Sequence, residues 1–119
     1  MADKDRLGAW GEDVAVGYLQ DAGLSVLARN WRCAEGELDI VAQDGSTVVF
    51  CEVKTRSGLG FGTPAEAVVP TKVRRIRRLA TAWLSAAGGG WPDLRFDVIS
   101  VVRGRPGAAP TVEHLRGAF

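Results

Sequence analysis

Residues 36–54 read GELDIVAQDGSTVVFCEVK and decide the fold. Two apolar runs flank an Asp-Gly pair at 44–45, which is a strong short-range signal for a β-hairpin. If Asp44 and Gly45 form a two-residue turn, the strands pair in a fixed register. The predicted opposite pairs are Gln43–Ser46, Val41–Val48, Asp39–Phe50 and Glu37–Glu52.

Charged side chains lie inside both predicted strands and share one face. Since side chains alternate with period 2, Asp39 and Glu52 become diagonal neighbours, with roughly 7–8 Å between their backbones. Glu37 opposite Glu52 would be repulsive without a cation between them, and Lys54 points to the same side. Carboxylate oxygens select Mg²⁺ or Mn²⁺ over zinc, so this face predicts a site that polarises a phosphate beside a lysine. The alternative is a charged strand end exposed to solvent.

The composition is that of an ordinary soluble globular protein. The chain has 119 residues, 46% hydrophobic and 24% charged, which predicts one domain over residues 1–119. A net charge of +1 gives no global argument for nucleic-acid binding. Locally, every charge from Glu35 to Glu52 is negative, and every charge from Lys54 to Arg78 is positive except Glu66. An acidic pocket beside a basic surface is what a metal-assisted phosphodiester enzyme needs.

The two cysteines, Cys33 and Cys51, form no zinc-binding spacing. Cys51 lies within a predicted strand and is expected to pack as a small hydrophobic residue. No signal peptide or membrane-length apolar run is visible. We therefore expect a cytoplasmic protein with no membrane association.

A helix is predicted from about Asp5 to Ala22, with Gly23 ending it. Its buried stripe contains Leu7, Trp10, Val14, Ala15, Tyr18 and Leu19. Glu12 lies at the edge of this stripe, and the helix pattern alone favours a solvated glutamate there.

A second helix is predicted from Pro70 or Thr71 to about Ala87, ended by three glycines. Its predicted buried stripe is Val73, Ile76, Leu79, Ala80, Trp83, Leu84 and Ala87. Four arginines occupy the remaining arc and lack acidic partners at helical spacing. They predict either a contact surface for backbone phosphates or a solvated basic face. The candidate nucleic-acid contacts are Arg56, Lys72, Arg74, Arg75, Arg77 and Arg78.

The remaining segments complete the predicted architecture. Strands are expected at 24–31, at 94–102 and, at an edge, at 111–115, where a lone His114 favours an incidental role. Residues 55–64 are expected to form a glycine-rich loop, and residues 64–68 a short helical turn. The order α-β-β-β-α-β-β predicts an α/β fold with a mixed β-sheet flanked by helices.

The motifs resemble those of a known nuclease superfamily. Glu12, Gly36-Glu37-Leu38-Asp39 and Glu52-Val53-Lys54 look like the PD-(D/E)xK pattern, with Leu38 in place of the usual proline. The wider chain is similar to the YraN-like family of endonuclease-like proteins. That match is carried by Gly11-Glu12, Ala15, Tyr18-Leu19, Arg29-Asn30-Trp31-Arg32, residues 36–39, 50–56, 61–64 and 95–98, and Ala118-Phe119.

The resemblance implies a restriction-endonuclease-like fold, related to archaeal Holliday-junction resolvases. By carry-over, Glu12, Asp39 and Glu52 would be Mg²⁺ ligands and Lys54 the catalytic lysine. Glu37 lies beside the motif and would be either an outer-shell group or part of the site. Resolvase-like relatives also imply a homodimer.

Two functional hypotheses follow, with a third that has less support. The first is a Mg²⁺- or Mn²⁺-dependent endonuclease acting on DNA, including branched or structured DNA. The second is a non-catalytic nucleic-acid-binding module that retains the nuclease fold. The third, a structural or partner-binding protein, is supported only by the near-neutral net charge.

Overall fold

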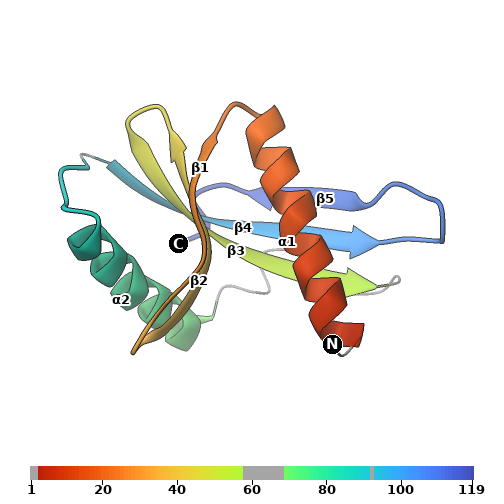
Figure 1. Cartoon of the computed structure of the whole chain (residues 1–119), viewed down its shortest axis with the longest axis horizontal. Helices are drawn as coiled ribbons and strands as arrows, with labels where there is room; N and C mark the ends of the chain where they lie inside the picture. Colours follow the sequence, from red (N-terminus) through yellow and green to blue (C-terminus); the bar gives the residue numbers. More distant parts are fainter. Residues whose placement is uncertain (1–2, 58–68, 92) are drawn as a thin grey trace.

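The computed structural model describes residues 3–57, 69–91 and 93–119 (Figure 1). Within these ranges the predicted order α-β-β-β-α-β-β is confirmed. The elements are α1 (Asp3–Asp21), β1 (Ser25–Cys33), β2 (Gly36–Asp44), β3 (Thr47–Ser57), α2 (Pro70–Ala86), β4 (Asp93–Arg103) and β5 (Thr111–Leu115).

The strands form one five-stranded sheet in the order β1-β2-β3-β4-β5. Neighbours pair antiparallel except β3 and β4, which run parallel because α2 lies on the connection between them. The sheet is therefore mixed, and the predicted α/β class with a mixed sheet and flanking helices is confirmed.

The predicted register of the β2–β3 hairpin is wrong by two residues. Asp44 pairs with Thr47, so the turn contains Gly45 and Ser46. Gly45 has φ 60°, as the first position of a type II′ turn requires. Asp44 stays in the strand, where its carboxylate accepts a hydrogen bond from Arg95 Nη1 of β4 at 3.1 Å. Val41, Val48 and Phe50 share a face as predicted, under α2. The predicted face is wrong for Glu37 and Asp39, because Leu38 packs under α2 with Val41 and these two acids meet Glu12 of α1.

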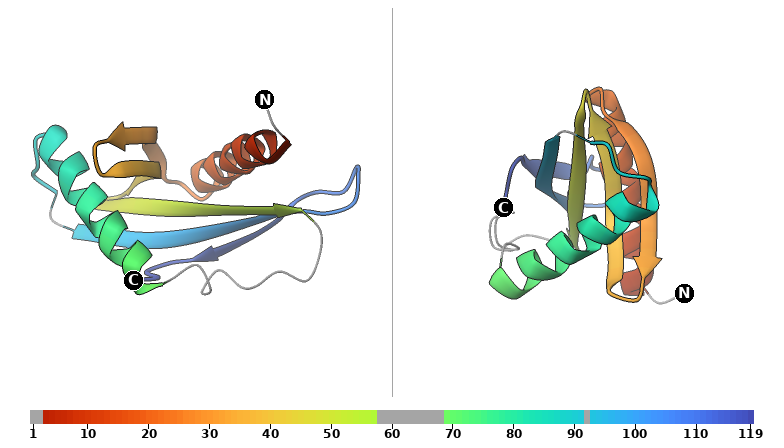
Figure 2. Two further views of the ribbon diagram at one scale, coloured as in Figure 1. Left: turned by 90° about the horizontal axis from the view of Figure 1, so that it is seen from below. Right: turned by 90° about the vertical axis from the view of Figure 1, so that its left-hand side faces the viewer.

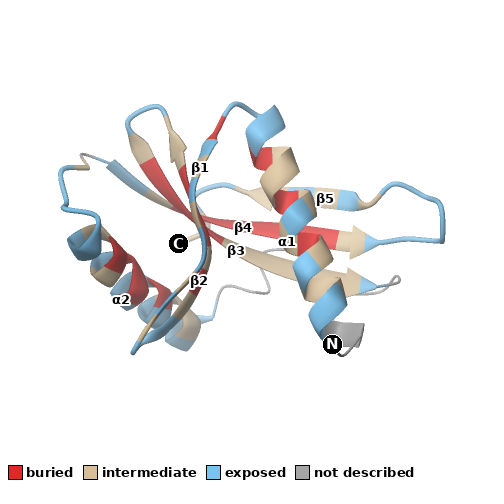
Figure 3. Ribbon diagram, viewed as in Figure 1, coloured by how far each residue is buried: buried red, intermediate tan, exposed pale blue. Residues whose placement is uncertain are grey.

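Two apolar clusters occupy opposite faces of the sheet, since they take alternate residues of β3 and β4. One packs under α1 and contains Ala15, Leu19, Leu24, Ile40, Ala42, Val49, Cys51, Ile99 and Val101. The other packs under α2 and contains Leu38, Val41, Val48, Phe50, Ile76, Leu79, Ala80, Trp83 and Phe96. Figure 3 shows the buried residues along the central strands, and Figure 2 shows α1 lying over β3 and β4. Cys51 packs as a small hydrophobic residue, as predicted.

Several boundaries differ from the prediction by one to three residues. β3 continues to Ser57 because it pairs with β4 through Ser57 and Arg103, so the expected loop starts later than residue 55. The rest of that loop and the expected helical turn at 64–68 lie outside the described residues. Ala87 of the predicted α2 stripe is exposed and follows the helix. In the part of the chain that is described, no helix is long and apolar enough to span a membrane.

His114 on β5 has a structural role that its sequence position did not indicate. Its Nε2 lies 2.7 Å from an oxygen of the fully buried Asp97, and its Nδ1 lies 3.1 Å from the Tyr18 hydroxyl of α1. Burial alone would raise the pKa of Asp97, but hydrogen bonds from His114, Arg95 and the Gly117 amide lower it. This network ties β5 and the C-terminal segment to α1 and β4.

α1 approaches β3 closely at Gly11. A Cβ at Gly11 would clash with the Oγ1 atom of Thr55. Glycine is thus required here for close approach, and it brings the next residue, Glu12, toward the sheet.

Gly11→Ala should lower the free energy of unfolding by about 1–3 kcal/mol, because the added methyl group overpacks the α1–β3 contact. Gly17→Ala is the matched control, since nothing lies within 4 Å of a Cβ there. That control should raise the free energy of unfolding by about 0.5–1 kcal/mol through helix propensity. Urea denaturation measures both changes. Equal shifts of the same sign in the two variants would contradict the close approach.

Candidate metal centre

Three carboxylates from α1 and β2 meet at one place. Glu12, Glu37 and Asp39 each offer an oxygen, and these oxygens all lie within 4.8 Å of one another. All three residues are half-buried. Carboxylates at this spacing repel one another in low dielectric unless they are protonated or share a cation.

Asp39 lies where the β2–β3 ladder stops. The last backbone pair is Ile40 with Cys51, and beyond it the Val53 amide donates to the Asp39 Oδ2 atom at 2.8 Å. Burial, followed by the charge of Glu52, raises the pKa of Asp39 to about 7. A carboxyl group that titrates near neutrality is a mark of a functional site.

Glu12 is held beside Asp39 by its neighbours on β1 and β2. Burial and the charge of Glu37 raise the pKa of Glu12, whereas a hydrogen bond from Asn30 and the charge of Arg29 oppose that rise. Asn30 has φ 50° and is the one non-glycine residue with positive φ in the described ranges. The sequence pattern did not predict the role of Asn30. The available signal was an asparagine inside a strand, since asparagine tolerates this conformation.

Two ion pairs lie at the solvent-exposed edge of the cluster, its rim. Arg29 contacts Asp13 at 2.7 Å, and Arg32 contacts Glu37 at 2.7 Å. A pocket of about 410 Å³ opens here, lined by Glu12, Glu37 and these neighbours. Glu37, expected either outside the site or within it, is thus one of the three clustered carboxylates.

Glu52 lies next to the cluster but is engaged by two lysines. Its Oε1 atom is 2.6 Å from Lys72 Nζ and 3.5 Å from Lys54 Nζ. The predicted proximity of Glu52 and Lys54 is therefore found, and Glu52 is near enough to raise the pKa of Asp39. Lys72, expected on the nucleic-acid-binding surface, contacts the site itself. Burial lowers the pKa of Lys72, and Lys54 adds to this effect.

The basic face of α2 is only partly solvated. Thr71, Lys72, Arg75 and Arg78 line a hollow of about 430 Å³ next to Glu52. Arg78 has no acidic partner at helical spacing, as expected, but it contacts Glu35 of the β1–β2 turn, far away in the sequence, at 3.3 Å.

The other arginines of the predicted contact surface differ in their surroundings. The Arg77 guanidinium lies 4.9 Å from the centre of the Phe96 ring. Arg74 and Arg75 are exposed, while Arg56 is half-buried on β3. Arg75 and Arg78 are both exposed and both line the hollow, but Arg78 is paired with Glu35.

The donor set fits a hard divalent cation. Three carboxylate oxygens within 4.8 Å of one another match the ligand type that Mg²⁺ and Mn²⁺ prefer. Burial and the charge of neighbouring acids raise the pKa of Asp39 and Glu12, and a divalent cation would offset the second of these causes.

Comparisons with known proteins agree on one family. Residues 11–101 match the model described as "Uncharacterised protein family UPF0102". A UPF0102 protein of Nocardia farcinica is 56% identical over 119 residues, covering 100% of this chain and 93% of its own length. Those of Beutenbergia cavernae and Frankia casuarinae are each 56% identical, covering 98% and 100% of both chains respectively.

Asp39→Asn should stabilise the metal-free protein at neutral pH. The folded state keeps the Asp39 proton up to about pH 7, whereas the unfolded chain releases it near 3.8. The folded state therefore binds more protons in this window, and its stability falls as pH rises through it. Asparagine carries no charge and retains an oxygen for the Val53 amide. We expect the free energy of unfolding at about pH 8 to increase by about 1–3 kcal/mol, with no difference below pH 3.8.

Asp13→Asn is the control, because Asp13 is an exposed carboxylate on the same rim. It should change stability by less than about 1 kcal/mol at either pH. Urea denaturation in EDTA measures each variant, and a destabilised Asp39→Asn protein at about pH 8 would refute the buried, repelled carboxylate.

Lys72→Met should increase the affinity of the site for Mn²⁺ by about three- to tenfold, because the Lys72 ammonium occupies a Glu52 oxygen. Arg75→Met removes the same charge from the same hollow without freeing that oxygen, and should change the affinity by less than about twofold. Isothermal titration calorimetry gives both values. An unchanged or weaker affinity in Lys72→Met would show that Lys72 does not compete with the ion.

Proposed function

Because the chain belongs to the uncharacterised protein family UPF0102, the YraN-like family indicated by its motifs, we propose its function from the site: a Mg²⁺- or Mn²⁺-dependent endonuclease that hydrolyses phosphodiester bonds in DNA. One observation carries this proposal. The clustered oxygens of Glu12, Glu37 and Asp39 lie beside an acid–lysine pair, Glu52 and Lys54. Carboxylates and a lysine around one point are the groups that metal-assisted phosphodiester hydrolysis uses.

In this proposal the carboxylates hold the ion. Glu12, Glu37 and Asp39 are candidate ligands, and Glu52 joins them once its Oε1 atom is released by Lys72. A bound divalent ion supplies a Lewis acid for the scissile phosphate and makes a coordinated water more acidic. Asp39 must lose its proton to bind the ion, so metal affinity should fall below the pKa of about 7.

The lysines and the basic hollow act on the substrate. Lys54 lies next to Glu52, so its ammonium is positioned to stabilise negative charge that develops on the phosphate. Lys72 and Arg75 line the hollow beside it, where backbone phosphates of the nucleic acid would lie. The resemblance to Holliday-junction resolvases makes branched DNA, bound by a homodimer, the first substrate to test.

Purified protein should nick supercoiled plasmid and cut a four-way DNA junction in Mn²⁺ or Mg²⁺ but not in EDTA. Asp39→Asn, Glu12→Gln and Lys54→Met should each lower the cleavage rate at least about a hundredfold, because each removes a ligand or the positioned cation. Asp13→Asn, next to Glu12 but paired with Arg29 on the rim, should cleave at the wild-type rate. Undiminished cleavage by Asp39→Asn and Glu12→Gln together would exclude this active site.

A specific observation also favours the alternative, a non-catalytic nucleic-acid-binding module. The ammonium groups of Lys54 and Lys72 already pair with Glu52. A nucleic-acid-binding surface that uses no metal would not need Glu52 as a metal ligand. That function predicts salt-sensitive binding in EDTA with no cleavage in Mn²⁺. Replacing Arg74, Arg75, Arg77 and Arg78 together would then weaken binding more than Asp39→Asn.

A further inference from the structure

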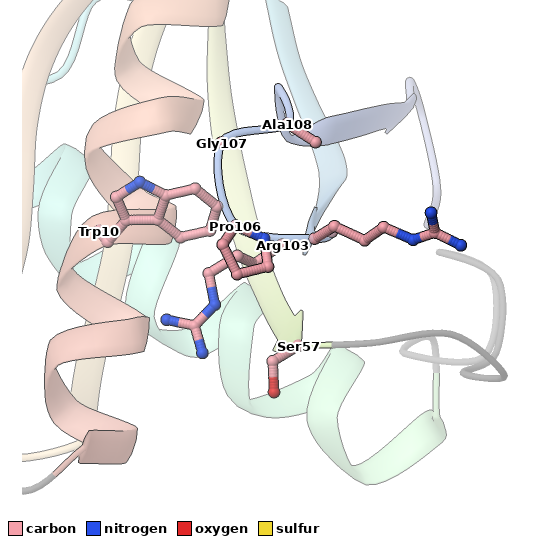
Figure 4. Close-up of a pocket in the computed structure, with 8 residues that line it drawn as sticks. Trp10, Ser57, Arg103, Pro106, Gly107 and Ala108 are labelled. Atoms are coloured by element: carbon pink, nitrogen blue, oxygen red, sulfur yellow. The ribbon is translucent and has the colours of Figure 1, made fainter.

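A second pocket lies on the α1 face of the sheet, away from the carboxylate cluster. It encloses about 520 Å³ and is lined by Trp10 of α1, Ser57 at the end of β3, and residues 103–108 of the β4–β5 connection. Figure 4 shows the Trp10 indole and Pro106 beside each other at this pocket. Its volume falls in the range of sites that bind small organic groups.

The chemistry of the lining combines an aromatic surface with unpaired positive charge. Trp10 is half-buried, packed partly against the core cluster under α1. Arg103 and Arg105 are exposed, and neither guanidinium has an ion-pair partner among the described residues. None of the described residues that line the pocket is acidic. An apolar, aromatic wall beside two guanidinium groups is complementary to a nucleobase with its phosphate.

We propose that this pocket binds one unpaired nucleotide of a nucleic-acid strand, with the base stacked on Trp10 and neighbouring phosphates contacted by Arg103 and Arg105. This inference rests on the proposed function in that it takes a nucleic acid as the substrate. It adds a substrate class: a strand with an unstacked base near the cleavage point. Duplex DNA keeps its bases stacked and offers the pocket only phosphates.

The position of the pocket relates it to the carboxylate site through two elements. Trp10 precedes Glu12 by two residues on α1, and Ser57 follows Lys54 by three residues on β3. Three residues of a strand span about 10 Å. Residues two apart on a helix and three apart on a strand point to nearly opposite sides. The pocket and the carboxylate cluster therefore open on different sides of α1, and a bound nucleic-acid strand would place different nucleotides at the two sites.

The test measures binding in EDTA, so that it does not depend on cleavage. A fluorescein-labelled single-stranded oligothymidylate is titrated with protein, and fluorescence anisotropy gives the dissociation constant. Trp10→Ala should weaken binding about five- to a hundredfold, as expected for one lost base–aromatic stack, and Trp10→Phe should weaken it less. Circular dichroism melting checks that each variant is folded.

Trp10 packs against the core cluster under α1, so its replacement could also affect folding. Variants of exposed arginines test the same pocket without that effect. Arg105→Ala should weaken binding about three- to tenfold. Arg116→Ala removes the same charge from an exposed position after β5, at the other end of that strand, and should have less than about a twofold effect.

A base-free strand of the same length separates stacking from charge. Loss of affinity for oligothymidylate in Trp10→Ala, with unchanged affinity for the abasic strand, would support the nucleotide pocket. Equal affinities of wild type, Trp10→Ala and Arg105→Ala for oligothymidylate would overturn it, as would a wild-type protein that binds no single strand. Plasmid nicking in Mn²⁺ is measured separately, so the nuclease proposal stands or falls on its own result.

Discussion

The site depends on where the β2–β3 ladder ends. Backbone pairing runs from the Gly45–Ser46 turn to Ile40 and Cys51, and then the Asp39 carboxylate accepts the Val53 amide at 2.8 Å. A side chain thus takes the place of the next backbone acceptor. The exchange satisfies a strand amide and fixes one Asp39 oxygen beside Glu52. The close contact of Gly11 with Thr55 then brings Glu12 to the same point from the other element.

This arrangement works against stability in the metal-free protein. Several acids share one half-buried region, and the raised pKa of Asp39 and of Glu12 records their burial and mutual repulsion. The chain offsets part of this repulsion with Lys54 and Lys72 on Glu52, Arg32 on Glu37, and Asn30 on Glu12. Clustered charge that costs folding free energy is a feature of many functional sites.

The periodicity of the sequence predicts most of the secondary structure and its order. Apolar spacing and glycine signals predict both helices and the hairpin. Side-chain alternation predicts that Val41, Val48 and Phe50 share a face, but not that Leu38 joins them. The register was predicted wrongly because Asp44 is held in the strand by Arg95, a contact across 51 positions that no local pattern reveals. The same limit applies to the site. The Glu52–Lys54 pair follows from strand alternation, whereas Lys72 on Glu52 and Glu35 on Arg78 join elements far apart in the chain.

Diffraction from crystals soaked in Mn²⁺ tests the central claim most directly. The account predicts an anomalous peak bonded to carboxylate oxygens of Glu12, Glu37 and Asp39, with Lys72 displaced from Glu52 if that residue also binds. An empty carboxylate cluster in crystals that bind Mn²⁺ elsewhere, with Lys72 still on Glu52, would contradict it. In that case Glu12, Glu37 and Asp39 would not form a metal site.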